Sequence, residues 1–200
     1  MKSRSNRSLR YVAKVGILAA MATVLMFLEF PLPFLAPEFY KLDFSEVPVL
    51  VGSFALGPLS GVLIELLKNL LKFLIMGSTT AGVGELSNFL TGCVFVLPAA
   101  LFYRARKTRR GALCGLSVGG ALFVIVGAAV NYFVLIPLYS RIYDLPLDVI
   151  VGMGAAVHPA ITDLRMLVLL AVVPFNFVKA VLDIVITFFL YKRVSFLLHA

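Results

Sequence analysis

The stretch Arg104-Ala105-Arg106-Lys107-Thr108-Arg109-Arg110 separates two long apolar runs, one from about Glu85 to Tyr103 and one from about Ala112 to Tyr132 or somewhat beyond. Each run has about the 20 residues that a helix needs to cross a lipid bilayer. The stretch itself carries five cations and no acid, which is typical of loops that stay on the cytoplasmic side of a membrane. It therefore predicts two membrane-spanning helices joined by a cytoplasmic loop.

The whole chain has the composition of a membrane protein. Of its 200 residues, 61% are hydrophobic and only 14% are charged, and the mean hydropathy is +1.02. So few charged residues cannot cover the surface of a soluble globule, which excludes soluble enzymes, disordered chains and disulfide scaffolds. Cys93 and Cys114 lie in apolar stretches and are interpreted as small buried hydrophobes. We expect one integral domain over residues 1–200, located in the cell membrane.

Four more apolar runs predict further spans, so the expected fold class is an all-α membrane protein with six transmembrane helices. The first run ends at Pro31 and Pro33, which cannot continue a helix. Residues 136–165 are mixed in character and are expected outside the membrane, with a short external helix from about Leu147 to Val157. The four additional spans are about Val12 to Phe30, Val47 to Leu59, Val62 to Met76 and Met166 to Leu190.

The distribution of charge predicts the orientation. Three segments without acids hold 12 of the 18 cations, and everything between them carries the 10 acids. The positive-inside rule then places both termini in the cytoplasm. This pattern explains the net charge of +8 without nucleic acid, and we expect membrane lipid as the surrounding partner. The three segments carry Lys2, Arg4, Arg7, Arg10 and Lys14, then the basic stretch at 104–110, then Lys192 and Arg193.

Ionisable residues inside predicted spans usually mark a binding site or an internal ion pair. The third span carries Glu65, Lys68, Asn69 and Lys72, whose spacing places them on one helical face. An internal salt bridge between Glu65 and Lys68 is favoured there, with ligand contact as the alternative. In the sixth span, Lys179 either contacts a ligand or pairs with Asp183 four residues later.

Three amides and a lysine are expected at a similar depth on different helices. They are Asn88, Asn131, Asn176 and Lys179. Lipid offers an amide no hydrogen-bond partner, so these groups predict a pocket for a planar heterocycle that has carbonyl and N–H edges. The aromatic residues of the first external loop either pack on such a ring or belong to the interfacial belt. These aromatic residues are Phe34, Phe39, Tyr40 and Phe44.

Catalytic and metal-binding motifs give no support to an enzyme. Gly115 to Gly119 matches G-x-S-x-G, but Ser117 and the external His158 are expected on opposite sides of the membrane, so small residues in this run are ascribed to close helix packing. No nucleotide-binding P-loop is present, and no His, Cys and acid cluster has metal-ligand spacing. We expect no enzymatic activity, cofactor or metal. Uphill transport would need energy from a partner or an ion gradient.

Four segments resemble the riboflavin-specific substrate-binding (S) component of energy-coupling factor (ECF) transporters. The resemblance covers nearly the whole chain. It implies six helices, cytoplasmic termini and riboflavin bound from outside. It also implies docking of the first helix on a transmembrane coupling subunit that works with two cytoplasmic ATPases. The segments are Lys41 to Pro48, Gly82 to Phe89, Asn131-Tyr132 and Pro174 to Lys179.

The resemblance also implies roles for individual residues. Asn131, Asn176 and Lys179 would hydrogen-bond the pyrimidine edge of the flavin, and Leu42, Asp43 and Phe44 would close over it. Gly84 and Asn88 are added for the ribityl side or for loop closure. The small residues Gly16, Ala19, Ala20 and Thr23 would dock the partner subunit, although ordinary internal packing also explains them. For the protein as a whole, two interpretations compete with riboflavin capture. One is an S component for a different vitamin, such as a thiamine-like or pyridoxine-like solute, and the second is a membrane enzyme or scaffold.

Overall fold

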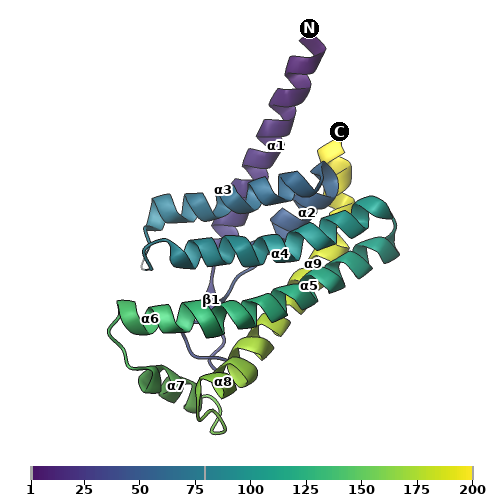
Figure 1. Cartoon of the computed structure of the whole chain (residues 1–200). Helices are drawn as coiled ribbons and strands as arrows, with labels where there is room; N and C mark the ends of the chain where they lie inside the picture. The colour runs from purple at the N-terminus through teal and green to yellow at the C-terminus, as the bar shows by residue number, and fades with distance from the viewer. Residues whose placement is uncertain (1, 79, 200) are drawn as a thin grey trace.

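The computed structural model describes residues 2–78 and 80–199, except the side chains of residues 2–7 and 194–199, so the expected cations Lys2, Arg4 and Arg7 lie outside the described side chains. The described chain is helical apart from one short hairpin (Figure 1). The elements are α1 (Lys2–Phe27), β1 (Phe30–Pro31), β2 (Lys41–Leu42), α2 (Glu46–Leu56), α3 (Pro58–Met76), α4 (Val83–Ala105), α5 (Arg109–Val130), α6 (Ile136–Ile142), α7 (Leu147–Ala155), α8 (Leu164–Leu167) and α9 (Val173–His199).

Four helical stretches are long and apolar enough to cross a membrane. They are Ser8–Phe27, Val83–Ala105, Arg109–Ile142 and Leu164–Arg193. The second and third expected spans correspond to α2 and α3. With 11 residues, α2 is only about 16 Å long. The structure thus confirms an all-helical protein with membrane-crossing helices, whereas the count of six spans and the cytoplasmic termini stay predictions.

Two π-helical segments make the fifth and sixth expected spans continuous. Asn131–Leu135 joins α5 to α6, and Val168–Val172 joins α8 to α9. Each segment lies just before or beside a proline, Pro137 or Pro174. Because proline has no N–H, the carbonyl four residues earlier loses its usual helical partner, and the turn can widen. The fifth span, which was expected to end at about Tyr132 or somewhat beyond, therefore continues to Ile142.

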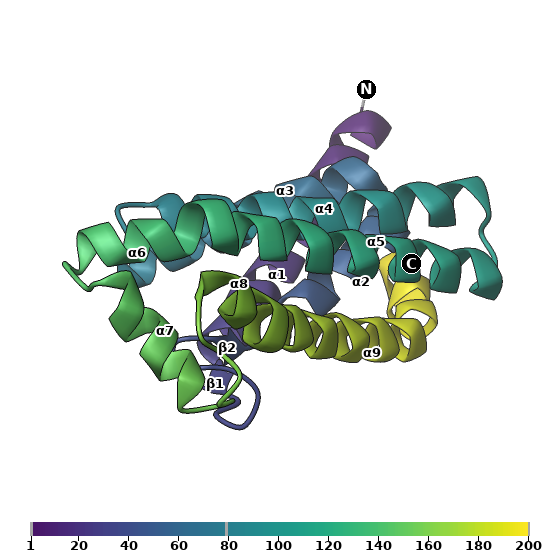
Figure 2. The ribbon, with the colours of Figure 1, turned by 60° about the horizontal axis from the view of Figure 1, so that its bottom comes forward.

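Helix α2 occupies the centre of the bundle. It contacts α1, α3, α4 and α9, and Figure 2 shows it enclosed between the layer of α4 and α5 and the long helix α9. Its residues from Glu46 to Phe54 are all buried. Val49 and Leu50 of α2 pack with Ile64 of α3 and Phe95 of α4 in the main hydrophobic core. A short helix that is buried along most of its length therefore forms the middle of the protein.

Helices α4 and α5 pack closely through glycines of α5. A Cβ atom at Gly115 would lie 2.6 Å from the carbonyl oxygen of Ala99, and one at Gly119 would collide with the carbonyl oxygen of Phe95. Only glycine allows the two backbones to come this near. The expectation that small residues around Ser117 serve close helix packing is confirmed.

A second hydrophobic cluster closes the end of the bundle that carries α6, α7 and α8. Ala36 and Leu42 of the segment between α1 and α2 pack there with Ile150 of α7 and Phe175 of α9. The strands β1 and β2 pair antiparallel and close this segment into a loop, called here the hairpin loop (residues 30–45). The short helix expected from about Leu147 is confirmed as α7.

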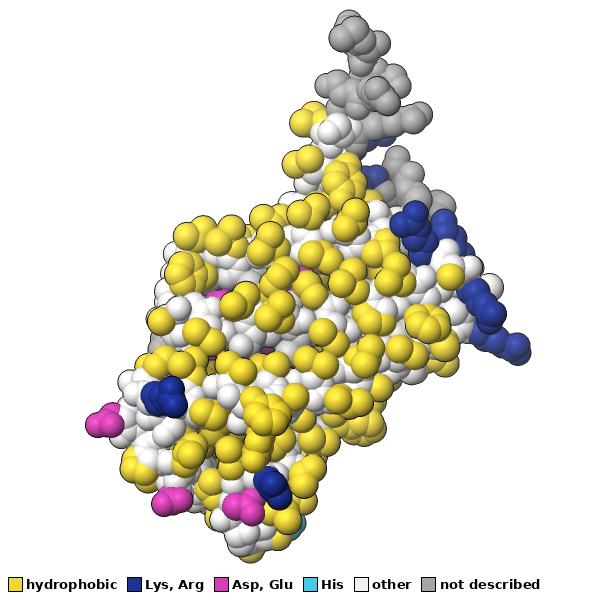
Figure 3. All heavy atoms as spheres, viewed as in Figure 1, with side chains coloured by type: hydrophobic (Ala, Val, Ile, Leu, Met, Phe, Trp, Pro, Cys, Tyr) yellow, Lys and Arg dark blue, Asp and Glu magenta, His cyan; other side chains and the backbone are white. Residues whose placement is uncertain are grey.

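Charge is distributed unevenly over the surface. In Figure 3 apolar side chains cover most of the face in view between the two ends of the molecule. Lys and Arg gather at one end, and the visible surface Asp and Glu side chains lie mainly at the opposite end, beside two cations. An apolar belt between two polar ends is the surface expected of a protein embedded in lipid.

Candidate functional site

A cavity of about 340 Å³ lies among the hairpin loop and the helices α1, α3, α4, α5 and α9. Its size is within the range of pockets that hold small organic ligands. Polar side chains from separate elements converge on it, namely Asp43, Ser87, Asn88, Thr91, Asn131, Asn176 and Lys179. Apolar and aromatic walls complete it, from Met26, Phe39, Tyr40, Phe123, Val130, Leu135, Tyr139 and Phe175.

Asn131 stands in the π-helical segment after α5 and is 8% exposed. Its Nδ2 donates to the carbonyl oxygen of Gly127 at 2.8 Å, and its Oδ1 accepts from the hydroxyl of Tyr40 at 2.8 Å. An amide has a second N–H and a second lone pair, so Asn131 keeps capacity for a ligand. The bond to Tyr40 also ties the hairpin loop to the wall of the cavity.

Asn176 lies on α9 and lines the cavity, and within the described residues it makes no hydrogen bond through its side chain. The space opposite is kept open by Gly127 of α5, where a Cβ atom would come within 2.8 Å of Asn176 Nδ2. A nearly buried amide without a protein partner is available to a ligand.

Lys179 lies one turn further along α9 and pairs with the hairpin loop. Its Nζ donates to Asp43 Oδ2 at 2.6 Å and to the Asp43 carbonyl oxygen at 3.2 Å. Burial alone would raise the pKa of Asp43, but the charges of Lys179 and Lys68, together with the hydrogen bonds from Lys179 and Ser45, outweigh burial and lower the pKa to about 2. The loop carboxylate is therefore ionised at neutral pH. Lys179 pairs in this structure with Asp43 and not with Asp183.

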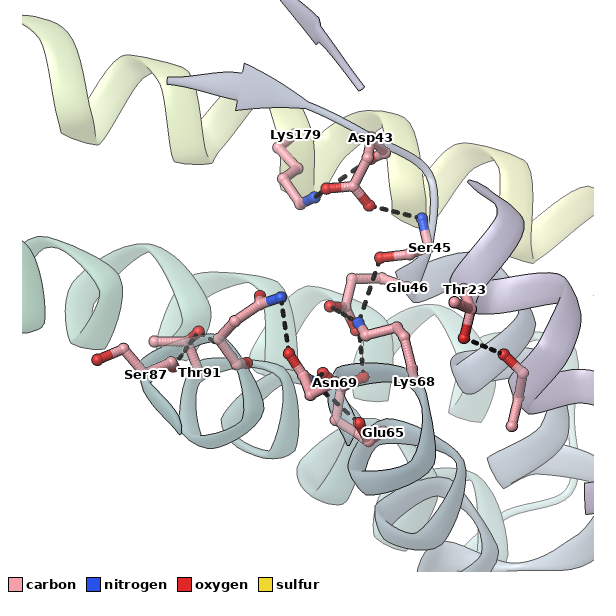
Figure 4. A network of polar contacts seen from close by, with 12 residues as sticks. Thr23, Asp43, Ser45, Glu46, Glu65, Lys68, Asn69, Ser87, Thr91 and Lys179 are labelled. Atoms are coloured by element: carbon pink, nitrogen blue, oxygen red, sulfur yellow. Dashed lines mark hydrogen bonds and ion pairs between the residues drawn. The ribbon is translucent and has the colours of Figure 1, made fainter. Parts of the chain in front are cut away.

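A buried ionic network continues below this pair (Figure 4). Lys68 of α3 lies 2.8 Å from Glu46 of α2 and 2.8 Å from Glu65 of α3, and all three side chains are inaccessible or nearly so. Lys68 also donates to the hydroxyl of Ser45. The backbone N–H of Ser45 in turn donates to the carboxylate of Asp43. The internal salt bridge between Glu65 and Lys68 is thus confirmed, and Glu46 is an additional partner that the sequence did not indicate.

The network reaches the cavity through two amides. Asn69 donates to the carboxylate of Glu65 at 2.9 Å, and Asn88 of α4 donates to Asn69 Oδ1 at 3.1 Å. Gly92 of α4 makes room for the carboxylate of Glu65, because a Cβ atom there would collide with it. The position of Asn88 in the cavity wall therefore depends on the buried charges of α3.

The rim of the cavity carries a looser group of charges. Glu29 lies 2.9 Å from Lys41 and 3.7 Å from Lys72, and these side chains are partly exposed. Lys72, on the polar face of α3, lines the cavity at this rim. Exposed pairs of this kind contribute little to stability.

Six of the eight candidate ligand residues line the cavity, and two do not. Leu42 is buried in the second hydrophobic cluster, and Phe44 packs between the clusters, with its ring 6.3 Å from that of Phe30. Of the other loop aromatics, Phe39 and Tyr40 line the cavity, whereas Phe34 is 78% exposed. The lining residues are Asp43, Gly84, Asn88, Asn131, Asn176 and Lys179.

Sequence reasoning missed several lining residues. Tyr139 and Phe175 add aromatic walls, and Ser87 and Thr91 add hydroxyls on the α4 side. Phe175 directly precedes the predicted ligand residue Asn176, and this neighbourhood in the sequence could have indicated that it lies near the site. Tyr139 gave no such signal, because the continuation of α5 into α6 was not foreseen.

The four small residues of α1 are divided between two faces. Ala19 and Thr23 are buried in the bundle, where Thr23 donates a hydrogen bond to the carbonyl oxygen of Ala19. Gly16 and Ala20 are exposed. Ala19 and Thr23 therefore serve internal packing, and Gly16 and Ala20 are the pair accessible to another helix.

Comparisons with known proteins agree on one family. Residues 10–191 match the family described as the ECF transporter, substrate-specific component. The chain is 35% identical over 182 residues to "Riboflavin transporter RibU" of Staphylococcus aureus, covering 90% of this chain and 88% of that protein. It is 33% identical over 175 residues to "Riboflavin transporter FmnP" of Bacillus subtilis, covering 86% and 85%.

The fold is also similar to a solved structure, described as "Structure and mechanism of the S component of a bacterial ECF transporter". The two agree with a TM-score of 0.73 and 32% sequence identity, and the match covers 96% of this chain and 99% of the other.

Proposed function

The chain belongs to the substrate-specific components of ECF transporters, and from this premise we propose that it captures riboflavin at the outer face of the cell membrane for uptake. It is a multi-pass membrane protein and a transporter subunit by family. The observation that carries the proposal is the cavity in which Asn131, Asn176 and Lys179 meet, enclosed by aromatic walls.

The chemistry of this cavity suits a flavin. The isoalloxazine ring is flat and apolar over most of its area, and its pyrimidine edge alternates carbonyl oxygens with an N–H. We propose that Asn176 and Lys179 hydrogen-bond this edge and that Asn131 contributes the remaining capacity of its amide. Phe39, Tyr40 and Phe175 would pack on the ring, since aromatic surfaces favour offset or edge-to-face contact.

The remaining polar residues suit the ribityl chain. Ser87, Asn88 and Thr91 lie along one side of the cavity on α4, and Gly84 precedes them by about one turn. A polyol needs several donors and acceptors in a row. Within the hairpin loop, Leu42 and Phe44 would support closure by packing against the hydrophobic clusters, and they do not line the cavity.

Titration of the ligand-free protein in detergent tests the proposed function. Riboflavin fluorescence should be quenched saturably on binding, with one site per chain, because stacking on aromatic side chains and exclusion of water change the excited state of the ring. Thiamine and pyridoxine serve as competitors. A protein that leaves flavin fluorescence unchanged but binds one of these vitamins would be an S component of another specificity.

Substitution of Gly127 by alanine should weaken riboflavin binding by about tenfold, the cost of one displaced hydrogen bond. The added Cβ atom would lie 2.8 Å from Asn176 Nδ2 and would force this amide away from its position. Gly120→Ala is the matched control on the same helix, because its Cβ atom would meet Ile184 of α9 at 2.9 Å, outside the cavity. Equal losses in the two variants, measured by flavin titration, would contradict the role of Asn176.

We further propose that transport requires the ECF module, composed of a transmembrane coupling subunit and two cytoplasmic ATPases. The chain has no P-loop of its own. The exposed pair Gly16 and Ala20 on α1 would allow a helix of the coupling subunit to approach closely. Riboflavin uptake by cells that express the chain with and without this module tests the proposal, since binding alone requires only the chain.

A further inference from the structure

The inward face of α9 carries a row of polar residues that extends beyond the cavity. Lys179 is followed at intervals of four by Asp183, Thr187 and Tyr191, and all four are buried. Both carboxylate oxygens of Asp183 are without a hydrogen-bond partner in the described part of the protein. A buried carboxyl group without a partner is costly, so it calls for an explanation in a second state of the molecule or in its ligands.

Each of the other buried acids nearby lies within ion-pair distance of a lysine. Lys68 holds Glu46 and Glu65, and Lys179 holds Asp43. Asp183 interacts electrostatically with Lys179, but no ion pair joins them among the described residues. Asp183 is thus the acid of this neighbourhood that lacks a cation in the structure with the loop closed.

Lys179 depends on a segment that has to move if a ligand enters. Asp43 belongs to the hairpin loop, whose residues Phe39, Tyr40 and Lys41 line the cavity. The two strands that close the loop have two residues each. If the loop lifts to admit a ligand, Asp43 moves away and the ammonium group of Lys179 loses its ion-pair partner. Losing the acidic partner of this lysine disfavours such a state, because the base of the cavity stays largely apolar.

Asp183 is positioned to form an ion pair with the ammonium group of Lys179. Residues four apart lie on the same face of a helix about one turn from each other. Side chains also lean toward the helix N-terminus, so the carboxylate of Asp183 leans toward Lys179. Side chains at this spacing can form an ion pair without a change in the helix backbone, through rotation of the flexible lysine side chain.

We propose that Asp183 is a positioning residue that takes over Lys179 from Asp43 when the hairpin loop opens. Lys179 then has an acidic partner whether the hairpin loop is closed or open. Opening of the loop therefore does not leave its charge without a partner. This inference rests on the proposed function, because it describes how a ligand reaches the cavity. Asp183 sets how often the loop opens, while the ligand itself is held by other residues.

A cysteine placed in the loop reports opening without any ligand. Ala36 is fully buried in the second hydrophobic cluster, and Ala36→Cys is a conservative change there. In a background of Cys93→Ala and Cys114→Ala, the rate at which a maleimide modifies this cysteine measures opening. Adding Asp183→Asn should slow modification by about tenfold or more, because the open state loses the partner of Lys179.

Thr187→Val is the matched control. It removes the next buried polar group of the same row, whose hydroxyl also has no partner among the described residues, and leaves both acids of Lys179 in place. Its modification rate should equal that of the parent. Modification of Asp183→Asn at the parent rate, or equal slowing in Thr187→Val, would overturn the proposal.

Ligand kinetics provide the second readout. In Asp183→Asn, association and dissociation of riboflavin should slow by similar factors, and the Kd should change little, because both steps pass through the open loop. A purely structural defect would weaken Kd instead. Should Asp183→Asn fail to fold, Asp43→Asn decides the matter: it frees Lys179 for Asp183 and should speed modification about tenfold, and an unchanged rate would overturn the exchange.

The two assays separate the two proposals. The modification assay contains no flavin, so a protein that does not bind riboflavin still reports whether Asp183 controls the loop. Shifted modification rates without flavin quenching would refute the proposed ligand and keep the exchange. Normal flavin quenching with unchanged modification rates would support the proposed ligand and refute the exchange of Lys179 between the two acids.

Discussion

Replacing Lys179 with alanine is expected to lower the affinity for riboflavin by about a hundredfold or more. The substitution removes the ammonium group from the cavity and leaves the carboxylate of Asp43 buried without its ion-pair partner, which helps to lower its pKa. The hairpin loop loses its ion pair with α9 at the same time. Fluorescence titration of the purified variant measures the loss, and its elution as a single species in detergent shows that it is folded.

Lys72→Ala is the control for this prediction. Lys72 lines the same cavity, but at the rim, where it is partly exposed and 3.7 Å from Glu29. Its removal should change the affinity by only about threefold, because exposed pairs are screened by water. If the two lysine variants bind riboflavin alike, the pairing of Lys179 with Asp43 is not what organises the site.

Replacing Lys68 with methionine is expected to destabilise the fold by about 3–5 kcal/mol, which corresponds to a lower melting temperature on the order of 10 °C. Lys68 is fully buried and is shared by Glu46 and Glu65, so its loss leaves two buried carboxylates without a cation. Methionine keeps most of the side-chain volume, and the effect is therefore one of charge. Thermal unfolding in detergent, followed by circular dichroism, gives the measurement.

Two further variants isolate the cause. Lys41→Met breaks an ion pair of similar length, 2.9 Å to Glu29, but this pair lies at the surface, and its loss should leave the melting temperature nearly unchanged. Adding Glu46→Gln and Glu65→Gln to Lys68→Met should recover much of the lost stability, because no buried charge remains. A triple variant as unstable as the single one would show that packing at Lys68, and not charge, is responsible.

The sequence predicted most helices, because long apolar runs and basic loops are local signals. The runs before and after Arg104 to Arg110 correspond to α4 and α5, and the run that begins near Met166 belongs to α8 and α9. The end of the fifth helix could not be placed in the same way. Pro137 is usually a sign that a helix stops, but here the π-helical segment at Asn131–Leu135 absorbs it and the helix continues.

The sequence predicted which polar residues belong to the candidate site, but it did not predict which of them pair with one another. Asn88, Asn131, Asn176 and Lys179 stood out because amides and charges are rare in apolar runs, and they line one cavity. The partner of Lys179 was another matter. The acid nearest in sequence is Asp183, yet Lys179 binds Asp43, which is 136 residues away. Only tertiary packing brings such residues together.

The sequence also could not predict which face of α1 packs against the bundle. Gly16, Ala19, Ala20 and Thr23 are equally small, and spacing alone offers two overlapping pairs. Which pair faces the bundle depends on the larger neighbours Val15, Leu18 and Met26, which are buried. Ala19 and Thr23 lie on that buried side.

The central helix α2 explains why this bundle contains a chamber at all. It is about 16 Å long, roughly half the thickness of the hydrocarbon layer. Its neighbours α1, α3, α4 and α9 continue past its first residue, Glu46, and their side chains Met26, Lys72, Asn88 and Lys179 line the cavity. A ligand bound in this cavity would therefore occupy the place of the missing turns of a transmembrane helix. Cargo size in such a design is set by the residue at which one helix begins.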